Sequence, residues 1–280
     1  MVRQTRRQVL GSAFAAALLS AQPPARVTRY VRFVRARQTS HGILDGNVIR
    51  EIKGELFGSH KETGAKYDLS GVKLLYPCQP PQLLAVGLNY RSHIGNQPVP
   101  KRPEVFLKPI SALQNPGDPI IIPEGAKNVH YEGELVLIIG KRVSKASIDE
   151  AREAIFGVTC GNDVSERDWQ GGPDKDMQWW RAKGADTFAP MGPCIARGLD
   201  YGKLLLQTRL NGKVVQKQYT ADLLFDGPAI VSWISRAVTL NPGDAIYTGT
   251  PGQTSRMNPG DIVEIDIEGI GVLRNPVKSV

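Results

Sequence analysis

A four-residue turn, Asn-Pro-Gly-Asp, occurs three times in this chain and is the feature that most restricts its fold. It begins at Asn115, Asn241 and Asn258, and an apolar stretch follows each copy. Proline fixes the first central position of a turn, and glycine accepts the positive φ that the second position of a type II turn requires. Because the residues around the three copies differ, we interpret them as independent turns that lead into strands and not as an internal repeat. The chain is therefore expected to be mainly β.

Two helices interrupt the strand-rich pattern. Ser147 and Glu150 form a capping-box pattern ahead of a helix that we predict over residues 148–156, closed by Gly157. Pro228 opens a second helix with an apolar composition.

The chain divides into a small N-terminal unit and a main domain. Residues 26–76 alternate apolar and polar residues in short pieces, which is typical of strands. Prolines at positions 77, 80 and 81 then interrupt regular structure. We predict a β-rich unit over residues 26–76 and a main domain over residues 80–280.

The positive charge of the chain lies at its N-terminus. The formal charge is +8, and residues 1–44 contain eight arginines but no lysine and no acidic residue. Of the 35 basic residues, 27 remain beyond this segment, against 27 acidic ones. A body that is formally neutral argues against nucleic acid as a partner, because phosphate binding needs a concentrated basic surface.

Residues 1–25 have the layout of a signal segment. Three arginines precede an uncharged apolar run, Val9–Leu19, which is too short to span a bilayer. The residues around Arg6 and Arg7 also resemble a twin-arginine export signal, with Val9 in place of the usual Phe. We expect export to the periplasm; the alternative is an amphipathic N-terminal helix on a cytoplasmic protein.

The three cysteines do not indicate a disulfide framework or a zinc site. Cys78, Cys160 and Cys194 form no CxxC or CxxH pattern, and their number is odd. We interpret them as buried apolar residues. A zinc site with thiolate ligands is not supported, and a single disulfide stays open if the protein is exported.

Two glutamates stand two residues apart beside a strongly apolar segment. In an extended chain such residues point to the same side, so Glu132 and Glu134 are expected to lie side by side. Because like charges repel strongly in a low dielectric, a divalent cation would hold them together. Carboxylate oxygens favour Mg²⁺, Mn²⁺ or Ca²⁺ over zinc or copper. The alternative is an exposed strand edge with two solvated glutamates. Asp163, at the end of another apolar segment, is either a third oxygen ligand or the cap of a turn.

Five motifs together resemble the fumarylacetoacetate hydrolase family. They follow the family's order and spacing over residues 80–280, and as a set they are far more specific than any one of them. The motifs are Gly-Leu-Asn-Tyr-Arg-Ser-His at 87–93, Tyr-Glu-Gly-Glu-Leu at 131–135, Asn-Asp-Val-Ser-Glu-Arg-Asp-Trp-Gln at 162–170, Lys-Gly at 183–184 and Thr-Gly-Thr-Pro at 248–251.

The resemblance implies a fold, a cofactor and an assembly. The family's catalytic domain is a mixed β-sandwich roll, so the chain is expected to be an α+β, mainly β protein with a small β-rich N-terminal unit. A homodimer is expected as well. By the same resemblance Glu132, Glu134 and Asp163 are the ligands of Mg²⁺, or of Mn²⁺ or Ca²⁺. From the composition and the short apolar run at the N-terminus, no membrane span is expected.

The resemblance also assigns roles to polar side chains near the metal. Lys183 resembles a lysine that steadies developing negative charge, Arg167 and Gln170 resemble residues that orient the substrate, and Thr250 resembles a threonine that binds its carboxylate. From residue type alone, the lysine and the arginine would be surface charges. The threonine would equally well belong to a structural turn.

His93 is the candidate general base, because an imidazole titrates near neutral pH. A lone histidine is more often structural. Hydrolytic members of the family carry a glutamate three residues after this histidine, whereas this chain has Asn96, and an amide cannot stabilise the imidazolium as a carboxylate does. Glu104 is a possible substitute from further along the chain.

These features predict a divalent-metal-dependent enzyme that acts on a small dicarbonyl or enol carboxylate. Isomerisation or tautomerisation of a 2-oxo-enoate is slightly favoured over hydrolysis of an acylpyruvate C–C bond, because it needs only a proton moved on a bound enolate. A metal-dependent carboxylate-binding protein without catalytic activity is the remaining alternative.

Overall fold

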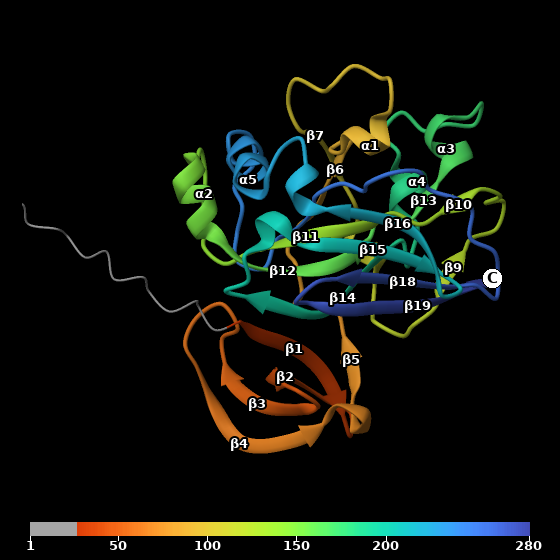
Figure 1. Cartoon of the computed structure of the whole chain (residues 1–280). Helices are drawn as coiled ribbons and strands as arrows, with labels where there is room; N and C mark the ends of the chain where they lie inside the picture. Colours follow the sequence, from red (N-terminus) through yellow and green to blue (C-terminus); the bar gives the residue numbers. More distant parts are fainter. Residues whose placement is uncertain (1–26) are drawn as a thin grey trace, which may run out of the picture.

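The computed structural model describes residues 27–280, so the predicted signal segment lies outside the described residues. The described part is mainly β, as predicted, with several mixed sheets and a small β unit at its N-terminal end (Figure 1). Within this part, no helix is both long and apolar enough to cross a bilayer.

Four consecutive antiparallel strands form the N-terminal unit, and its edge joins the main sheet. β1 pairs with β2 on one side, and on the other side Tyr30 of β1 pairs with Ile195 of β14. A short strand, β5, also pairs with β1. The strands are β1 (Thr28–Arg35), β2 (Gln38–Asp45), β3 (Val48–Gly54), β4 (His60–Asp68) and β5 (Lys73–Leu75).

The largest sheet continues from β1 through the centre of the molecule. Its order is β4-β3-β2-β1-β14-β12-β11-β17-β6-β7, so β11 and β12 are internal strands and β7 lies at an edge. The β8 strand pairs with β14 off this path. The remaining strands of this sheet are β6 (Leu83–Gly87), β7 (Glu104–Leu107), β8 (Leu113–Gln114), β11 (Gly133–Ile139), β12 (Ile155–Asn162), β14 (Ala189–Arg197) and β17 (Ala245–Tyr247).

A second sheet packs on the first and encloses the main core. Its order is β16-β15-β18-β19-β9, and its Ile265 belongs to the same buried cluster as Leu135 of β11 and Val158 of β12. A small two-stranded sheet, β10 with β13, lies beside it. These strands are β9 (Ile120–Ile122), β10 (Val129–His130), β13 (Ser165–Glu166), β15 (Leu205–Leu210), β16 (Lys213–Tyr219), β18 (Ile262–Ile267) and β19 (Gly271–Ser279).

The predicted turns and helices are present. Gly117, Gly243 and Gly260 have φ values of 82°, 94° and 95°, the conformation that a type II turn requires of its glycine. The capping box at Ser147 is formed, but the helix after it ends at Ala154, two residues earlier than predicted. The reason is that the next residue, Ile155, begins β12 and pairs with Ile139 of β11.

Among the described residues, five short α-helices lie around the sheets. α2 and α5 lie next to each other at one side, whereas α1, α3 and α4 lie at the end where the residues of the five motifs meet (Figure 1). The helices are α1 (Arg91–Ile94), α2 (Ile148–Ala154), α3 (Arg167–Gly171), α4 (Trp180–Gly184) and α5 (Gly227–Ser235). The predicted helix at Pro228 is α5, which Asp226 caps through a bond from the Ala229 N–H.

Candidate metal centre

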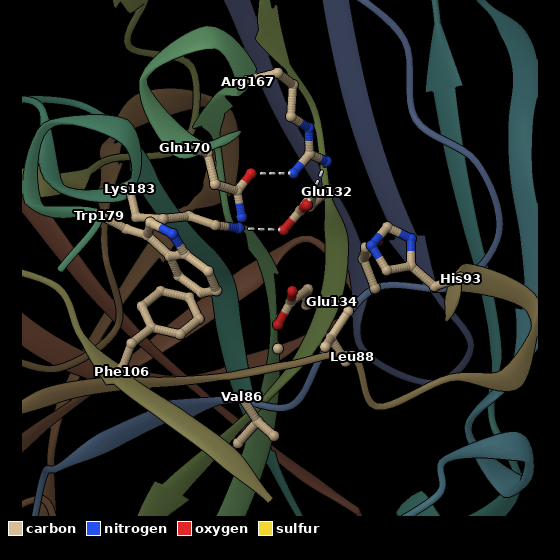
Figure 2. Close-up of a pocket in the computed structure, with 12 residues that line it drawn as sticks. Val86, Leu88, His93, Phe106, Glu132, Glu134, Arg167, Gln170, Trp179 and Lys183 are labelled. Atoms are coloured by element: carbon tan, nitrogen blue, oxygen red, sulfur yellow. Dashed lines mark hydrogen bonds and ion pairs between the residues drawn. The ribbon is translucent and has the colours of Figure 1, made fainter. Parts of the chain in front are cut away.

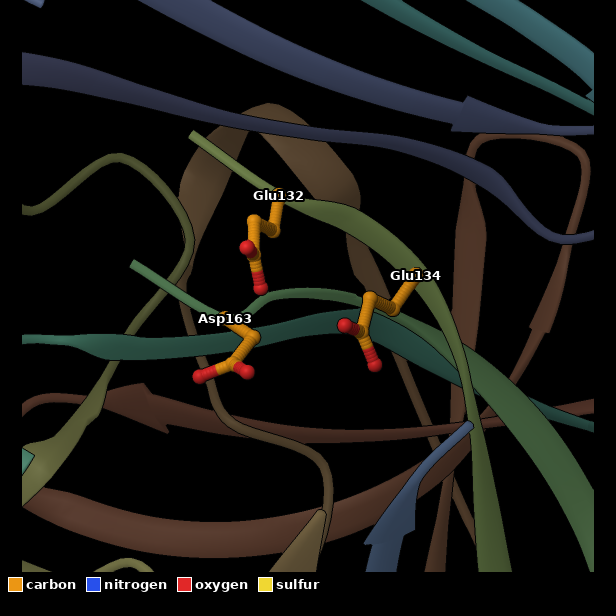
Figure 3. Close-up of side chains that lie close together, drawn as sticks. All are labelled: Glu132, Glu134 and Asp163. Atoms are coloured by element: carbon orange, nitrogen blue, oxygen red, sulfur yellow. The ribbon is translucent and has the colours of Figure 1, made fainter. Parts of the chain in front are cut away.

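Three acidic side chains meet at the ends of the two central strands. Glu132 and Glu134 flank the first residue of β11, and Asp163 follows β12, whose Asn162 lies opposite Gly133. The Asp163 N–H donates to the carbonyl of Glu132 at 2.9 Å, which fixes this register. One ligand oxygen from each carboxylate lies within 4.8 Å of the others, and all three residues are buried (Figure 3). The alternative of an exposed strand edge is therefore wrong for this pair of glutamates.

Two buried lysines are bonded to these carboxylates. Lys183 Nζ donates to Glu132 Oε2 at 2.6 Å and to Asp163 Oδ2 at 2.7 Å. Lys108 Nζ donates to Asp163 Oδ1 at 2.5 Å and to the carbonyl of Lys183. Sequence analysis missed Lys108. The available signal was its position at the end of a short strand, where alternation turns Phe106 and Lys108 to the same side.

Arg167 supplies a third cation at the same centre. Its guanidinium donates to Glu132 and, at 2.6 Å, to Gln170 Oε1 (Figure 2). A further bond of 2.8 Å to Thr254 Oγ1 fixes the guanidinium against the loop before β18. The predicted pair Arg167 and Gln170 is thus part of one hydrogen-bonded arrangement with Glu132.

The two glutamates differ in their electrostatic surroundings. Burial would raise the pKa of Glu132, but Arg167 and Lys183 outweigh it and hold that pKa below its ordinary value. Burial raises the pKa of Glu134 well above its ordinary value, and the neighbouring Asp163 and Glu132 raise it further. The Gly249 N–H donates to Glu134 at 2.7 Å. Glu134 has no ion-pair partner among residues 27–280, and a buried set of hard oxygen donors of this kind fits a divalent ion such as Mg²⁺, Mn²⁺ or Ca²⁺.

His93 faces this centre with a defined tautomer. Its Nδ1 lies 2.7 Å from the carbonyl oxygen of Gly252. Because a carbonyl can only accept, Nδ1 carries the proton and Nε2 is left as an acceptor. Asn96 is exposed, and its side chain has no hydrogen bond within residues 27–280. Glu104 lines a neighbouring cavity instead. A backbone carbonyl therefore orients the imidazole, and neither of the two side chains considered from sequence does so.

Thr250 lines the cavity, but its hydroxyl is already engaged. It donates to the carbonyl of Gly133 at 2.9 Å and accepts from Gln216 Nε2 at 2.9 Å. These bonds tie the loop that contains Thr250 to the beginning of β11, which agrees with a structural role for the turn. Gln216, on β16, was not singled out from sequence.

The centre opens into a small cavity of about 40 Å³. This volume is enough for an ion and a few water molecules. Seven of the eight predicted site residues line the cavity, and Asp163, which is bonded to Lys183, is not part of the lining. His93 lies at one side of the glutamates, and Phe106 and Trp179 lie at the other. The lining residues among the predicted set are His93, Glu132, Glu134, Arg167, Gln170, Lys183 and Thr250.

Two family models match this chain in succession. The model described as fumarylacetoacetate (FAA) hydrolase C-terminal matches residues 82–278. The model described as Rv2993c-like, N-terminal, matches residues 28–77.

Named relatives and solved structures are similar over most of the chain. An oxaloacetate tautomerase of Xenopus laevis mitochondria is 38% identical over 221 residues, which cover 74% of this chain and 69% of that protein. The structure of 2-hydroxyhepta-2,4-diene-1,7-dioate isomerase from Mycobacterium marinum has 40% identity and a TM-score of 0.83, with 90% and 98% of the two chains covered. Maleylpyruvate hydrolase from a Sphingobium species, in complex with manganese and pyruvate, has 27% identity and a TM-score of 0.73, with 90% and 99% covered.

Proposed function

Because the chain belongs to the fumarylacetoacetate hydrolase family, we propose that it is a divalent-metal-dependent enzyme that isomerises or tautomerises a 2-oxo-enol or 1,3-dicarbonyl carboxylate. Members of this family include an isomerase, a tautomerase and hydrolases. The observation that carries the proposal is the buried cluster of Glu132, Glu134 and Asp163 at the cavity.

These three carboxylates would hold Mg²⁺, Mn²⁺ or Ca²⁺. Their oxygens are hard donors, and the structure of the Sphingobium relative in complex with manganese and pyruvate supports this assignment. When bound, the ion supplies a Lewis acid that stabilises an enolate.

His93 is the group that would move a proton. Its Nε2 is free to accept one from a substrate carbon or hydroxyl, while Nδ1–H stays bonded to the Gly252 carbonyl. A neutral carbonyl stabilises the resulting imidazolium less than a carboxylate would. A proton shuttle that returns its proton to the same bound enolate suits this arrangement better than the sustained activation of a water for C–C cleavage.

The cationic side chains would bind and orient the anionic substrate. Lys183 lies on the cavity wall and would balance negative charge that develops on a substrate oxygen. Arg167 and Gln170, bonded to each other, line the cavity and would orient the substrate. The loop of Thr250 would contribute through its backbone, because its hydroxyl is engaged with Gly133 and Gln216.

The proposal is tested by following the keto–enol conversion of oxaloacetate by ultraviolet absorbance, with Mg²⁺ and with EDTA. We expect conversion that depends on the ion and is abolished in Glu134→Gln. The matched control is Glu153→Gln, which removes an exposed carboxylate that forms an ion pair with Lys141. Full activity of Glu134→Gln in EDTA would refute the metal site.

A second assay separates the alternatives. An acylpyruvate is incubated with the enzyme, and released pyruvate is measured with a coupled dehydrogenase. Release of pyruvate at a rate above that of oxaloacetate conversion would favour hydrolysis. Calorimetric binding of the acylpyruvate with no spectral change and no pyruvate would favour a binding protein without catalysis.

A further inference from the structure

The small catalytic cavity lies beside a much larger one. The second cavity has a volume of about 990 Å³, against about 40 Å³ for the first. Among residues 27–280, only Phe106 and Trp179 line both. Their rings meet edge to face, with centroids 5.6 Å apart and planes at 78°. The two aromatic side chains therefore form the wall between the cavities.

We propose that this Phe106–Trp179 wall determines substrate length. It confines the site to short 2-oxo-enol carboxylates and excludes those with a long or aromatic acyl group. The inference rests on the proposed function, because it names the substrate class of the same site. It also adds a role for two residues that the metal and proton chemistry does not require.

The wall is held by the catalytic centre itself. Trp179 has a left-handed backbone (φ 57°, ψ 18°) at the start of α4, and its carbonyl accepts from the Lys183 N–H at 2.8 Å. Lys183 Nζ lies 5.3 Å from the centre of the Phe106 ring, within range of a cation–π contact. Phe106 belongs to β7 and is opposite Ala85 of β6. The backbone of each residue is thus fixed by α4 or by the sheet, and the rings contact each other and Lys183.

The two sides of the wall differ in chemistry. On the catalytic side, a substrate must fit between the imidazole of His93 and the two rings, which lie on opposite sides of the glutamates (Figure 2). On the far side, the second cavity exposes Leu107, Ile110, Met177 and Trp180. An apolar acyl group would therefore find apolar surface if the wall were removed.

The test compares two substrates, oxaloacetate and benzoylpyruvate, in wild type and variants with Mg²⁺. Trp179→Gly removes the indole, and glycine adopts the left-handed backbone without strain. We expect kcat/KM for benzoylpyruvate relative to oxaloacetate to rise about tenfold or more. Phe106→Ala should shift this ratio in the same direction. Trp180→Gly, a residue that lines only the second cavity, should leave it unchanged.

Two outcomes would contradict the proposal that the Phe106–Trp179 wall determines substrate length. One is an unchanged ratio in both Trp179→Gly and Phe106→Ala when their Mg²⁺ affinity and Tm match those of wild type. The other is a wild-type preference for benzoylpyruvate. If wild type converts neither substrate, the proposed function fails, and calorimetric Kd values for oxalate and phenylpyruvate with Mg²⁺ replace kcat/KM. The proposed role of the wall then predicts that both variants gain affinity for phenylpyruvate relative to oxalate. Equal Kd ratios in wild type and variants would reject that role.

Discussion

Lys108 has no exposed side-chain surface, and yet it belongs to a cluster of opposite charges. The carboxylates of Glu132 and Asp163 are bonded to three cations, Lys108, Lys183 and Arg167. Burial lowers the pKa of Lys108, and Asp163 partly opposes this effect. A bound divalent ion would give the centre a net positive charge, which would attract an anionic substrate into the cavity.

Removal of the Lys108 charge should destabilise the metal-free protein. In Lys108→Met the Asp163 carboxylate keeps one cationic partner instead of two, so we expect a loss of about 3–5 kcal/mol in the free energy of unfolding, at most. Urea denaturation with EDTA measures it, and the loss should be smaller with Mg²⁺, which restores positive charge. Lys141→Met is the control, because its ion pair with Glu153 is exposed and should contribute almost nothing. Equal losses in both variants would contradict the role of Lys108.

The acidic ligand candidates could be predicted from the sequence because strand alternation and five linked motifs specify them. For Lys108, alternation after β7 indicates the side to which it points but not the carboxylate that it touches, and a single glutamine such as Gln216 in a strand carries no local signal of its partners. The contact that orients His93 was also out of reach. It comes from the backbone of Gly252, which every residue type offers alike.

At the scale of elements, the pairing of β11 with β12 depends on glycine. Gly161 lies opposite Glu134, and a Cβ built on it would come within 2.4 Å of the Tyr247 ring and of Val136. Tyr247 is fully buried and donates to the carbonyl of Pro190, so it has little freedom to move. The close approach of these strands keeps the carboxylates at their ends in register.

Gly161→Ala should therefore lower stability and disturb the metal centre together. Overpacking at such a site costs about 1–3 kcal/mol. We expect a lower Tm and weaker Mg²⁺ binding, which thermal denaturation and titration calorimetry measure. Gly71→Ala is the control, because nothing lies within 4 Å of the added methyl group. A variant with wild-type Tm and Mg²⁺ affinity would show that the strands can separate without cost.

The elements themselves were largely predictable, because their signals are local. Turn chemistry at the Asn-Pro-Gly-Asp copies and capping at Ser147 act over four residues, and both are present. The end of α2 could not be predicted, because it depends on the pairing of Ile155 with β11, which is distant in sequence. The conformation of Trp179, which positions the wall beside Lys183, likewise follows from packing.

At the scale of the whole molecule, the three cysteines report on the integrity of the core. All are free and buried, which confirms the interpretation from sequence. Burial raises the pKa of Cys78 and of Cys194 to about 12 and that of Cys160 well above its ordinary value. The homodimer and the export signal stay predictions.

The thiols should be inert in the native protein at pH 8. A pKa of about 12 leaves roughly one thiolate in ten thousand at that pH, and the sulfur is shielded as well. We expect no fast reaction with a disulfide reagent in buffer and three equivalents in denaturant. Because a raised pKa favours the thiol, the reaction should stay slow as pH increases through the ordinary range of cysteine. Fast labelling of one thiol in folded protein would contradict the burial.

The join between β1 and β14 makes the N-terminal unit inseparable from the rest of the molecule, although family models treat the two parts as distinct stretches. An engineer who trimmed the chain at residue 78 would strip one side of β14 of its hydrogen-bonding neighbour. The exposed edge of β14 could then pair with another polypeptide, which promotes aggregation. Shortened versions of this protein should accordingly be designed from its hydrogen-bonding pattern and not from the extent of a matched segment.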